Sequence, residues 1–258
     1  MRHVLAIAGR ELRSMFVTPD AYVLSGAYML VAGFFFFVYL GVYLQELQQI
    51  QALGMLQMLE QFTLQDFVIQ NAFSTFVLIL CLVVPLLAMR AIAAERATGS
   101  IELLLTSPVT SGEIVVGKFL AIAALLAGLG LLTGLFALLL FLYGDPELWQ
   151  TLAGLQTLFL YSIALASITC FISALTRSQI VAGLVGVLAG ILLMVLPAAA
   201  ESAQNAQLKE VLRWLGSTTH VEPGLKGDIR SEDLSYFAIV TVVFLSLARA
   251  AVDSLRWR

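Results

Sequence analysis

The sequence contains very few of the side chains that carry most enzyme and metal chemistry. Among its 258 residues there are two histidines, His3 and His220, and two cysteines, Cys81 and Cys170. Both cysteines lie inside apolar runs, where a thiol behaves as a small hydrophobic side chain. No apolar run contains a histidine, an aspartate pair or an H-E-x-x-H motif, which excludes the known kinds of intramembrane protease. The sequence therefore predicts no catalytic residue, no bound cofactor and no metal site.

Charged residues are also scarce. Asp, Glu, Lys and Arg make up 12% of the chain, whereas 60% of it is hydrophobic, and the mean hydropathy is +0.94. Soluble domains have roughly 25% charged residues, so this composition indicates a membrane protein. A net charge of −3 with scattered basic residues offers no surface for nucleic acid.

Six apolar runs are long enough to cross a bilayer as helices of about 17–25 residues. They fall near residues 21–44, 71–92, 113–143, 151–175, 180–200 and 234–252. The sequence therefore predicts an all-α polytopic protein with six transmembrane helices in a single transmembrane domain, 1–258. No acid or lysine lies at mid-membrane, which argues against a proton relay. Two G-x-x-x-G motifs, at residues 130–134 and 186–190, permit close helix contact inside the subunit or at a dimer seam.

Lysine and arginine counts predict the orientation, because cytoplasmic loops of membrane proteins are enriched in both. Ten of the fourteen basic residues lie in the two terminal segments, at 90–118 or at 176–179, and these parts are expected to be cytoplasmic. Of the opposite segments, 45–70 is glutamine-rich and amphipathic and favours a short surface helix. The pattern over 201–215 suits a surface helix, and whether it re-enters the membrane stays open.

The first eighteen residues predict an amphipathic helix that lies in the membrane interface. Apolar side chains recur at helical spacing, and the charged ones, among them Arg10, Glu11 and Arg13, lie mostly on the other face. Pro19 is expected to separate this helix from the first span, because proline disfavours helix at the residue before it.

The stretch AAERATGSIELLLTSP, residues 93–108, connects the second and third spans. Arg96 and Gly99 are typical of a helix end, and Ser100 can cap a new helix over 100–107. Thr110 and Glu113 fit a capping box that opens the third span. A helix of about seven residues is marginal alone, so it needs a partner surface. The residues leave two surfaces open, the lipid headgroups and a cytoplasmic protein.

Several segments together resemble one family. ERATGSIELLLTSP, residues 95–108, followed by EIVVGKF, residues 113–119, resembles the signature of ABC-2 type transporter permeases. Residues 10–22 resemble the interfacial helix of that family and its entry into the first span. Residues 220–237 resemble the last outer loop of the subgroup that includes gliding-motility and nitrous-oxide-reductase-maturation permeases.

This resemblance implies the transmembrane permease subunit of an ATP-driven exporter in a bacterial or archaeal cytoplasmic membrane. Two copies, or this chain and a relative, would bind cytoplasmic ABC ATPase subunits, and an extracytoplasmic or membrane accessory protein is a further partner to consider. The helix over 100–107 would then be the coupling helix that contacts the ATPase. The resemblance assigns this contact to Glu95, Arg96, Gly99, Ser100, Glu102, Leu104, Thr106 and Pro108. Arg10, Glu11 and Arg13 would form a second contact.

The chain itself is not expected to bind ATP or Mg²⁺. Residues 112–118 spell G-x-x-x-x-G-K, but Phe119 replaces the Ser or Thr of a phosphate loop, and the stretch opens a membrane helix. ATPase activity is therefore expected in the partner subunit. Two alternatives remain open: a scaffold that uses an ABC ATPase to transmit force or signal to an extracytoplasmic partner, and an ion-coupled carrier with no ATPase.

Overall fold

The structure is a computed structural model that describes residues 2–54, 63–101, 109–143 and 146–255. Every secondary-structure element in these ranges is a helix. The elements are α1 (Arg2–Val17), α2 (Pro19–Ala52), the π-helix η1 (Gln65–Ile69), α4 (Gln70–Ala88), α5 (Ala93–Thr98), α7 (Ser111–Tyr143), α8 (Leu148–Leu175), α9 (Gln179–Glu201), α10 (Ala206–Leu215), α11 (Ser217–Leu225) and α12 (Ser231–Ser254).

Six helical segments of the described ranges are long and apolar enough to cross a membrane. They are α2, the segment from η1 through α4 to α5, α7, α8, α9 and α12. This result confirms the predicted all-α polytopic fold with six transmembrane helices. The long third run forms one unbroken helix, α7, whose 33 residues extend over about 50 Å at 1.5 Å per residue.

The glutamine-rich segment after the first span differs from its prediction. Residues 45–52 do not form a separate surface helix but continue α2, which is 34 residues long. The sequence has no glycine or proline between residues 42 and 53 that would end the helix. Where the chain is next described, η1 leads directly into α4.

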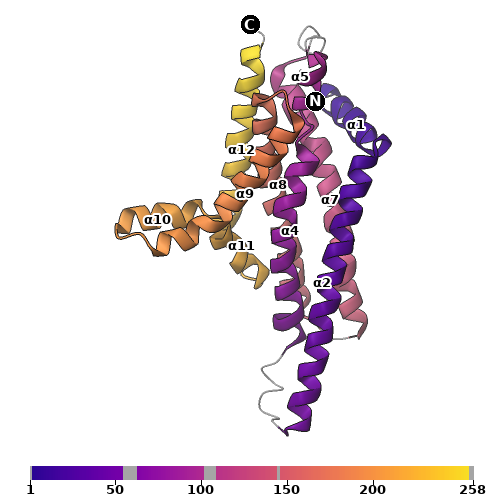
Figure 1. The fold of residues 1–258 in the computed structure, drawn as a ribbon, viewed down its shortest axis with the longest axis vertical. Coiled ribbons are helices and arrows are strands. Elements are labelled where there is room, and N and C mark those ends of the chain that lie inside the picture. Colours follow the sequence, from indigo (N-terminus) through magenta and orange to yellow (C-terminus); the bar gives the residue numbers. More distant parts are fainter. Residues whose placement is uncertain (1, 55–62, 102–108, 144–145, 256–258) are drawn as a thin grey trace.

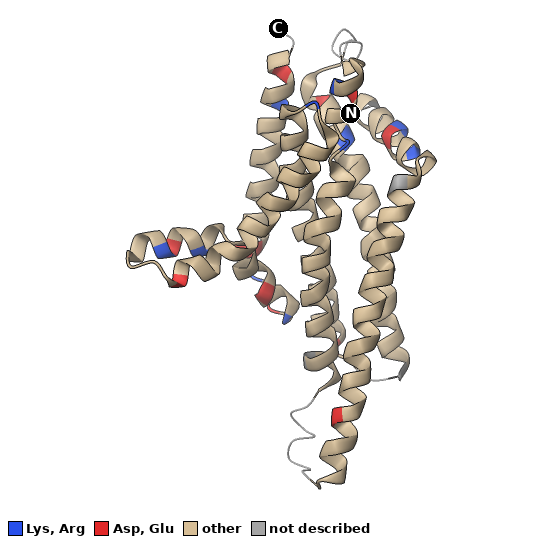
Figure 2. Ribbon diagram, viewed as in Figure 1, with Lys and Arg blue, Asp and Glu red and all other residues tan. Residues whose placement is uncertain are grey.

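The helices form an elongated bundle with charged residues near both ends of several spans. Figure 1 shows α1, α5 and both chain ends at one end of the bundle, while α2 extends farthest in the opposite direction. α10 projects sideways from the bundle (Figure 1). Charged residues gather around α1, α5 and the last turns of α12, and again around α10, α11 and the first turn of α12 (Figure 2). α9 and α12 expose large apolar side chains, among them Leu184, Leu188, Val242 and Val243.

α4 and α8 are the central helices. In their apolar windows 72% and 67% of the residues are buried, compared with 22% in α2, α9 and α12. An aromatic cluster joins three helices at the core: the Phe136 ring lies 5.3 Å from Phe36 and 6.0 Å from Phe76, measured between ring centroids. The hydroxyl groups of Tyr28 and Thr133 form a buried hydrogen bond of 2.9 Å between α2 and α7.

Glycines let α9 pack closely against α4 and α8. A Cβ atom on Gly186 would lie 2.8 Å from the Thr169 hydroxyl oxygen and 3.0 Å from Pro85 Cβ. A Cβ atom on Gly190 would lie 2.8 Å from the Cys81 sulfur. The motif at 186–190 therefore packs inside the subunit. A Cβ atom on Gly130 of the other motif would meet no atom within 4 Å.

We expect Gly186→Ala to destabilise the protein and Gly130→Ala not to. Alanine is the better helix former by roughly 1 kcal/mol, but overpacking at Gly186 should cost about 1–3 kcal/mol. Thermal unfolding of the two variants in the same detergent measures the difference. Equal or higher unfolding temperatures for both variants, relative to the wild type, would contradict the close packing of α9.

Candidate functional site

The start of α5 is capped by α8. The Ser173 hydroxyl oxygen accepts hydrogen bonds from the backbone N–H groups of Ile92 and Ala93, at 3.0 and 2.8 Å. The same hydroxyl donates to the Met89 carbonyl oxygen at 2.9 Å. N–H groups in the first turn of a helix have no hydrogen-bond acceptor within the helix. At the start of α5 the hydroxyl oxygen of the buried Ser173 is that acceptor.

The end of α5 is fixed by a glycine and an arginine. Gly99 adopts a left-handed conformation with φ 74°, which side-chain-bearing residues rarely adopt. This confirms the helix end predicted at Gly99. Immediately after it, the hydroxyl groups of Thr98 and Ser100 hydrogen-bond at 2.8 Å. The Arg96 guanidinium donates to the carbonyl oxygen of Ala174, in the last turn of α8. α5 is therefore fastened to the end of α8 through both Ser173 and Arg96.

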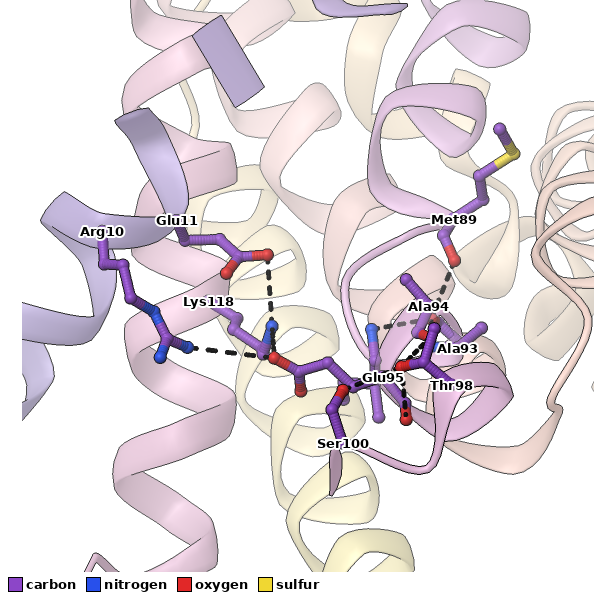
Figure 3. A network of polar contacts seen from close by, with 11 residues as sticks. Arg10, Glu11, Met89, Ala93, Ala94, Glu95, Thr98, Ser100 and Lys118 are labelled. Carbon is purple, nitrogen blue, oxygen red and sulfur yellow. Dashed lines mark hydrogen bonds and ion pairs between the residues drawn. The ribbon is translucent and has the colours of Figure 1, made fainter. Parts of the chain in front are cut away.

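A buried lysine joins α5 to two further helices (Figure 3). Lys118 of α7 has a side chain that is only 2% exposed, and its ammonium nitrogen lies 2.9 Å from Glu95 of α5 and 3.1 Å from Glu11 of α1. The Arg10 guanidinium lies 3.9 Å from the same Glu95 oxygen. Lys118 is thus the common partner of two carboxylates from two different helices.

The exposure of each side chain decides how much its ion pair contributes to stability. The side chains of Glu11 and Glu95 are 18% and 17% exposed, whereas that of Arg10 is 61% exposed. Solvent-exposed ion pairs contribute about 0–1 kcal/mol, so Arg10 adds little. Removing one partner of a buried pair costs about 3–5 kcal/mol because the remaining charge is buried without compensation. The Lys118 contacts therefore hold α1, α5 and α7 together.

α1 can reach Lys118 because the residue beside it has no side chain. A Cβ atom on Gly117 would lie 2.9 Å from Ile7 Cβ and 3.1 Å from the Val4 carbonyl oxygen. The close contact of α1 with α7 thus requires glycine at this position, one residue before the lysine that pairs with Glu11.

The predicted capping box at the start of α7 is confirmed. The Glu113 carboxylate accepts hydrogen bonds from the backbone N–H and from the hydroxyl of Thr110, both at 3.0 Å. The Glu113 N–H in turn donates to the Thr110 hydroxyl oxygen at 3.2 Å. These bonds fix the start of the helix that carries Lys118.

A cavity of about 670 Å³ lies beside the charged group. Its lining comes from α1, the start of α2, the end of α4, α5 and α7, and includes Ser14, Thr18, Leu24, Leu86, Ala94 and Leu125. Arg10, Glu11 and Glu95 also line it. The contacts of Glu11 and Glu95 with Lys118 therefore connect α1 and α5 at the edge of this cavity.

The structure brings together some of the residues predicted as a contact site. Glu95, Arg10 and Glu11 meet around Lys118, and Arg96, Gly99 and Ser100 form the end of α5 and its following turn. Arg13 is exposed on α1 and belongs to none of the ion pairs described above. The helix predicted over 100–107 lies, from residue 102 onward, outside the described residues, and so do Glu102, Leu104, Thr106 and Pro108.

Two residues that position this site were not predicted from the sequence, Lys118 and Ser173. A lysine eight residues after a capping threonine can equally be a solvent-facing cation of the membrane interface, and a serine in a span commonly bonds within its own helix. One feature of the sequence does point to Lys118: it is the last charged residue of α7, and only uncharged residues follow it in that helix.

Comparison with protein families gives a match over nearly the whole chain. The family described as ABC-2 family transporter protein matches residues 5–252, from α1 into the last turns of α12. No curated protein matches the sequence.

We expect Lys118→Met to lower the free energy of unfolding by about 3–5 kcal/mol, because it leaves Glu11 and Glu95 buried without their shared cation. Unfolding in mixed micelles of a mild detergent and SDS measures this loss.

The triple variant Lys118→Met/Glu11→Gln/Glu95→Gln should recover most of the lost stability, because no charge then stays buried. Lys209→Met is the matched control, since Lys209 lies on α10, which has no buried residue. A Lys118→Met variant as stable as this control would contradict the role given to the buried lysine.

Proposed function

The chain belongs to the ABC-2 family of transporter proteins and is a membrane permease component of an ABC system, and we propose that it couples ATP hydrolysis to export. A separate cytoplasmic ABC ATPase binds ATP and Mg²⁺ and performs the hydrolysis. The functional unit contains two permease subunits, either two copies of this chain or this chain with a relative. Within the family, residues 220–237 favour the gliding-motility and nitrous-oxide-reductase-maturation group.

The surface that contacts the ATPase is proposed to comprise α5 and the residues after it, together with α1. The first part consists of Glu95, Arg96, Gly99, Ser100, Glu102, Leu104, Thr106 and Pro108. Arg10, Glu11 and Arg13 form the second. The observation that supports this assignment is the burial of Lys118 between Glu11 and Glu95. A displacement of α5 or α1 would also displace α7, because separating Glu95 or Glu11 from Lys118 would leave a buried charge unpaired.

The proposed orientation places the end with α1 and α5 in the cytoplasm of a bacterial or archaeal cell. Basic residues gather at this end around α1, α5 and the last turns of α12 (Figure 2), in agreement with the enrichment of lysine and arginine in cytoplasmic segments. Both chain ends lie there too (Figure 1). An ATPase that approaches from the cytoplasm would meet α1 and α5 first.

We expect Glu102→Lys to reduce the amount of ABC ATPase that copurifies with the tagged protein by more than about tenfold, because a misplaced like charge at an interface costs several kcal/mol. Quantitative mass spectrometry of preparations from native membranes in mild detergent measures the ratio. Glu210→Lys on α10 is the matched charge reversal, and its ATPase content should equal that of the wild type. If the wild type carries no ABC ATPase, or if both reversals lose it equally, the proposed contact is wrong.

The choice between exporter and scaffold depends on what stimulates the ATPase. In proteoliposomes that contain the permease and its ATPase, an exporter should hydrolyse ATP faster when a transported small molecule or lipid is added. Stimulation only by an extracytoplasmic protein would instead identify the scaffold. Hydrolysis that does not depend on the permease would contradict both.

A further inference from the structure

A second buried ionisable group lies far from α5, where α10, α11 and α12 meet. His220 of α11 is 5% exposed. Its Nδ1 atom lies 2.7 Å from a carboxylate oxygen of Asp233 on α12, and its Nε2 atom lies 3.0 Å from the backbone carbonyl oxygen of Trp214 on α10. The imidazole of α11 thus contacts both α10, which precedes it in the chain, and α12, which follows it.

Both partners of the ring are hydrogen-bond acceptors. A neutral imidazole has one N–H group, so it can donate to only one of them. Two hydrogen bonds therefore require two protons on the histidine and aspartate pair. Imidazole is a stronger base than carboxylate, so both protons belong on the ring, which makes His220 an imidazolium next to an ionised Asp233.

The surrounding contacts fix the ring in this position. The Tyr236 ring stacks on the imidazole with centroids 4.1 Å apart, and the Tyr236 hydroxyl donates to the Leu215 carbonyl oxygen at 2.8 Å. Tyr236 lies on α12, so a second hydrogen bond connects α12 to the end of α10. The other Asp233 oxygen is buried and has no hydrogen-bond partner among the described residues. A buried carboxylate of this kind depends on a neighbouring cation.

Titratable groups lie on each of the helices next to His220: Arg213 in the last turn of α10, Glu222 on α11, and Glu232, Asp233 and Tyr236 on α12. Tyr161 of α8 interacts electrostatically with Tyr236 and with Cys81 of α4. Arg230, just before α12, interacts electrostatically with Asp233. The residues of α9 that contact this region are neutral: Thr218 donates to the Met194 carbonyl oxygen, and Gly216 packs on Pro197.

We propose that His220 is a buried imidazolium that fastens the α10–α11 hairpin to α12, and that the hairpin loosens when this proton is lost. The inference does not depend on the ATPase assignment, since it concerns residues remote from α5. As the pH rises, the ring keeps one N–H and releases either the Trp214 carbonyl or Asp233.

The charge of His220 can be observed directly because the chain has only one other histidine. His3 is exposed, and His3→Gln leaves His220 as the single histidine. The variant is labelled with ¹⁵N-histidine, reconstituted in phosphatidylcholine bilayers and studied by magic-angle-spinning NMR. At pH 6 we expect both ring nitrogens to be protonated, with one proton lost on titration to pH 9. A neutral ring at pH 6, or a charged ring throughout, would overturn the proposal.

Hydrogen exchange tests the consequence for the hairpin. After correction for the intrinsic pH dependence of exchange, peptides from residues 206–225 should exchange on the order of tenfold faster above the NMR transition, as expected for one lost charge-assisted hydrogen bond. Peptides from α8 serve as the internal control and should not change. In His220→Gln the corrected rates should not depend on pH. Equal pH dependence in this variant and the wild type, or none in the wild type, would overturn the proposal.

Discussion

The end of the molecule that carries α1 and α5 depends on one buried positive charge. Lys118 enters a membrane helix with its ammonium group away from water, and this is tolerable only because Glu11 and Glu95 come to it from two other helices. Neither carboxylate could be buried without the lysine, and α1 could not approach α7 without Gly117. α1, α5 and α7 therefore form one unit, in which α1 and α5 each supply a carboxylate and α7 supplies the ammonium group that lets these charges be buried together.

The lengths of the spans impose a second constraint. α9 and α12 have 23 and 24 residues, about 35 Å of helix, which suits a hydrocarbon core of about 30 Å. α2, with 34 residues, is about 15 Å longer than α9 at the same rise per residue. Since the α1 junction and the start of α9 lie at the same end of the bundle (Figure 1), the extra length of α2 extends beyond the level at which α9 ends. The two sides of the bundle are therefore unequal in height at the end remote from α5.

The features that the sequence predicted are those that neighbouring residues determine. Six apolar runs, the helix end at Gly99 and the capping box of Thr110 and Glu113 each depend on a short stretch of chain. The contacts of Lys118 and Ser173 depend on which helices pack together, and no local pattern encodes that. The expected surface helix over 45–70 was wrong at its start because a loss of hydrophobicity does not end a helix when good helix formers continue.

α8 connects the buried ion pairs of Lys118 at one end of the protein with the buried pair of His220 and Asp233. Near its end, Ser173 and Ala174 hold α5; nearer its start, Thr157 packs so closely on α11 that a Cβ atom on Gly224 would lie 2.1 Å from its hydroxyl oxygen. α8 is also one of the two central helices, with most of its apolar window buried. A densely packed helix bends little, so a tilt of α8 produced at α5 would also displace α11, which carries His220. The α5 end and the α10–α11 hairpin are therefore linked by one continuous helix, although they lie at different levels of the bundle.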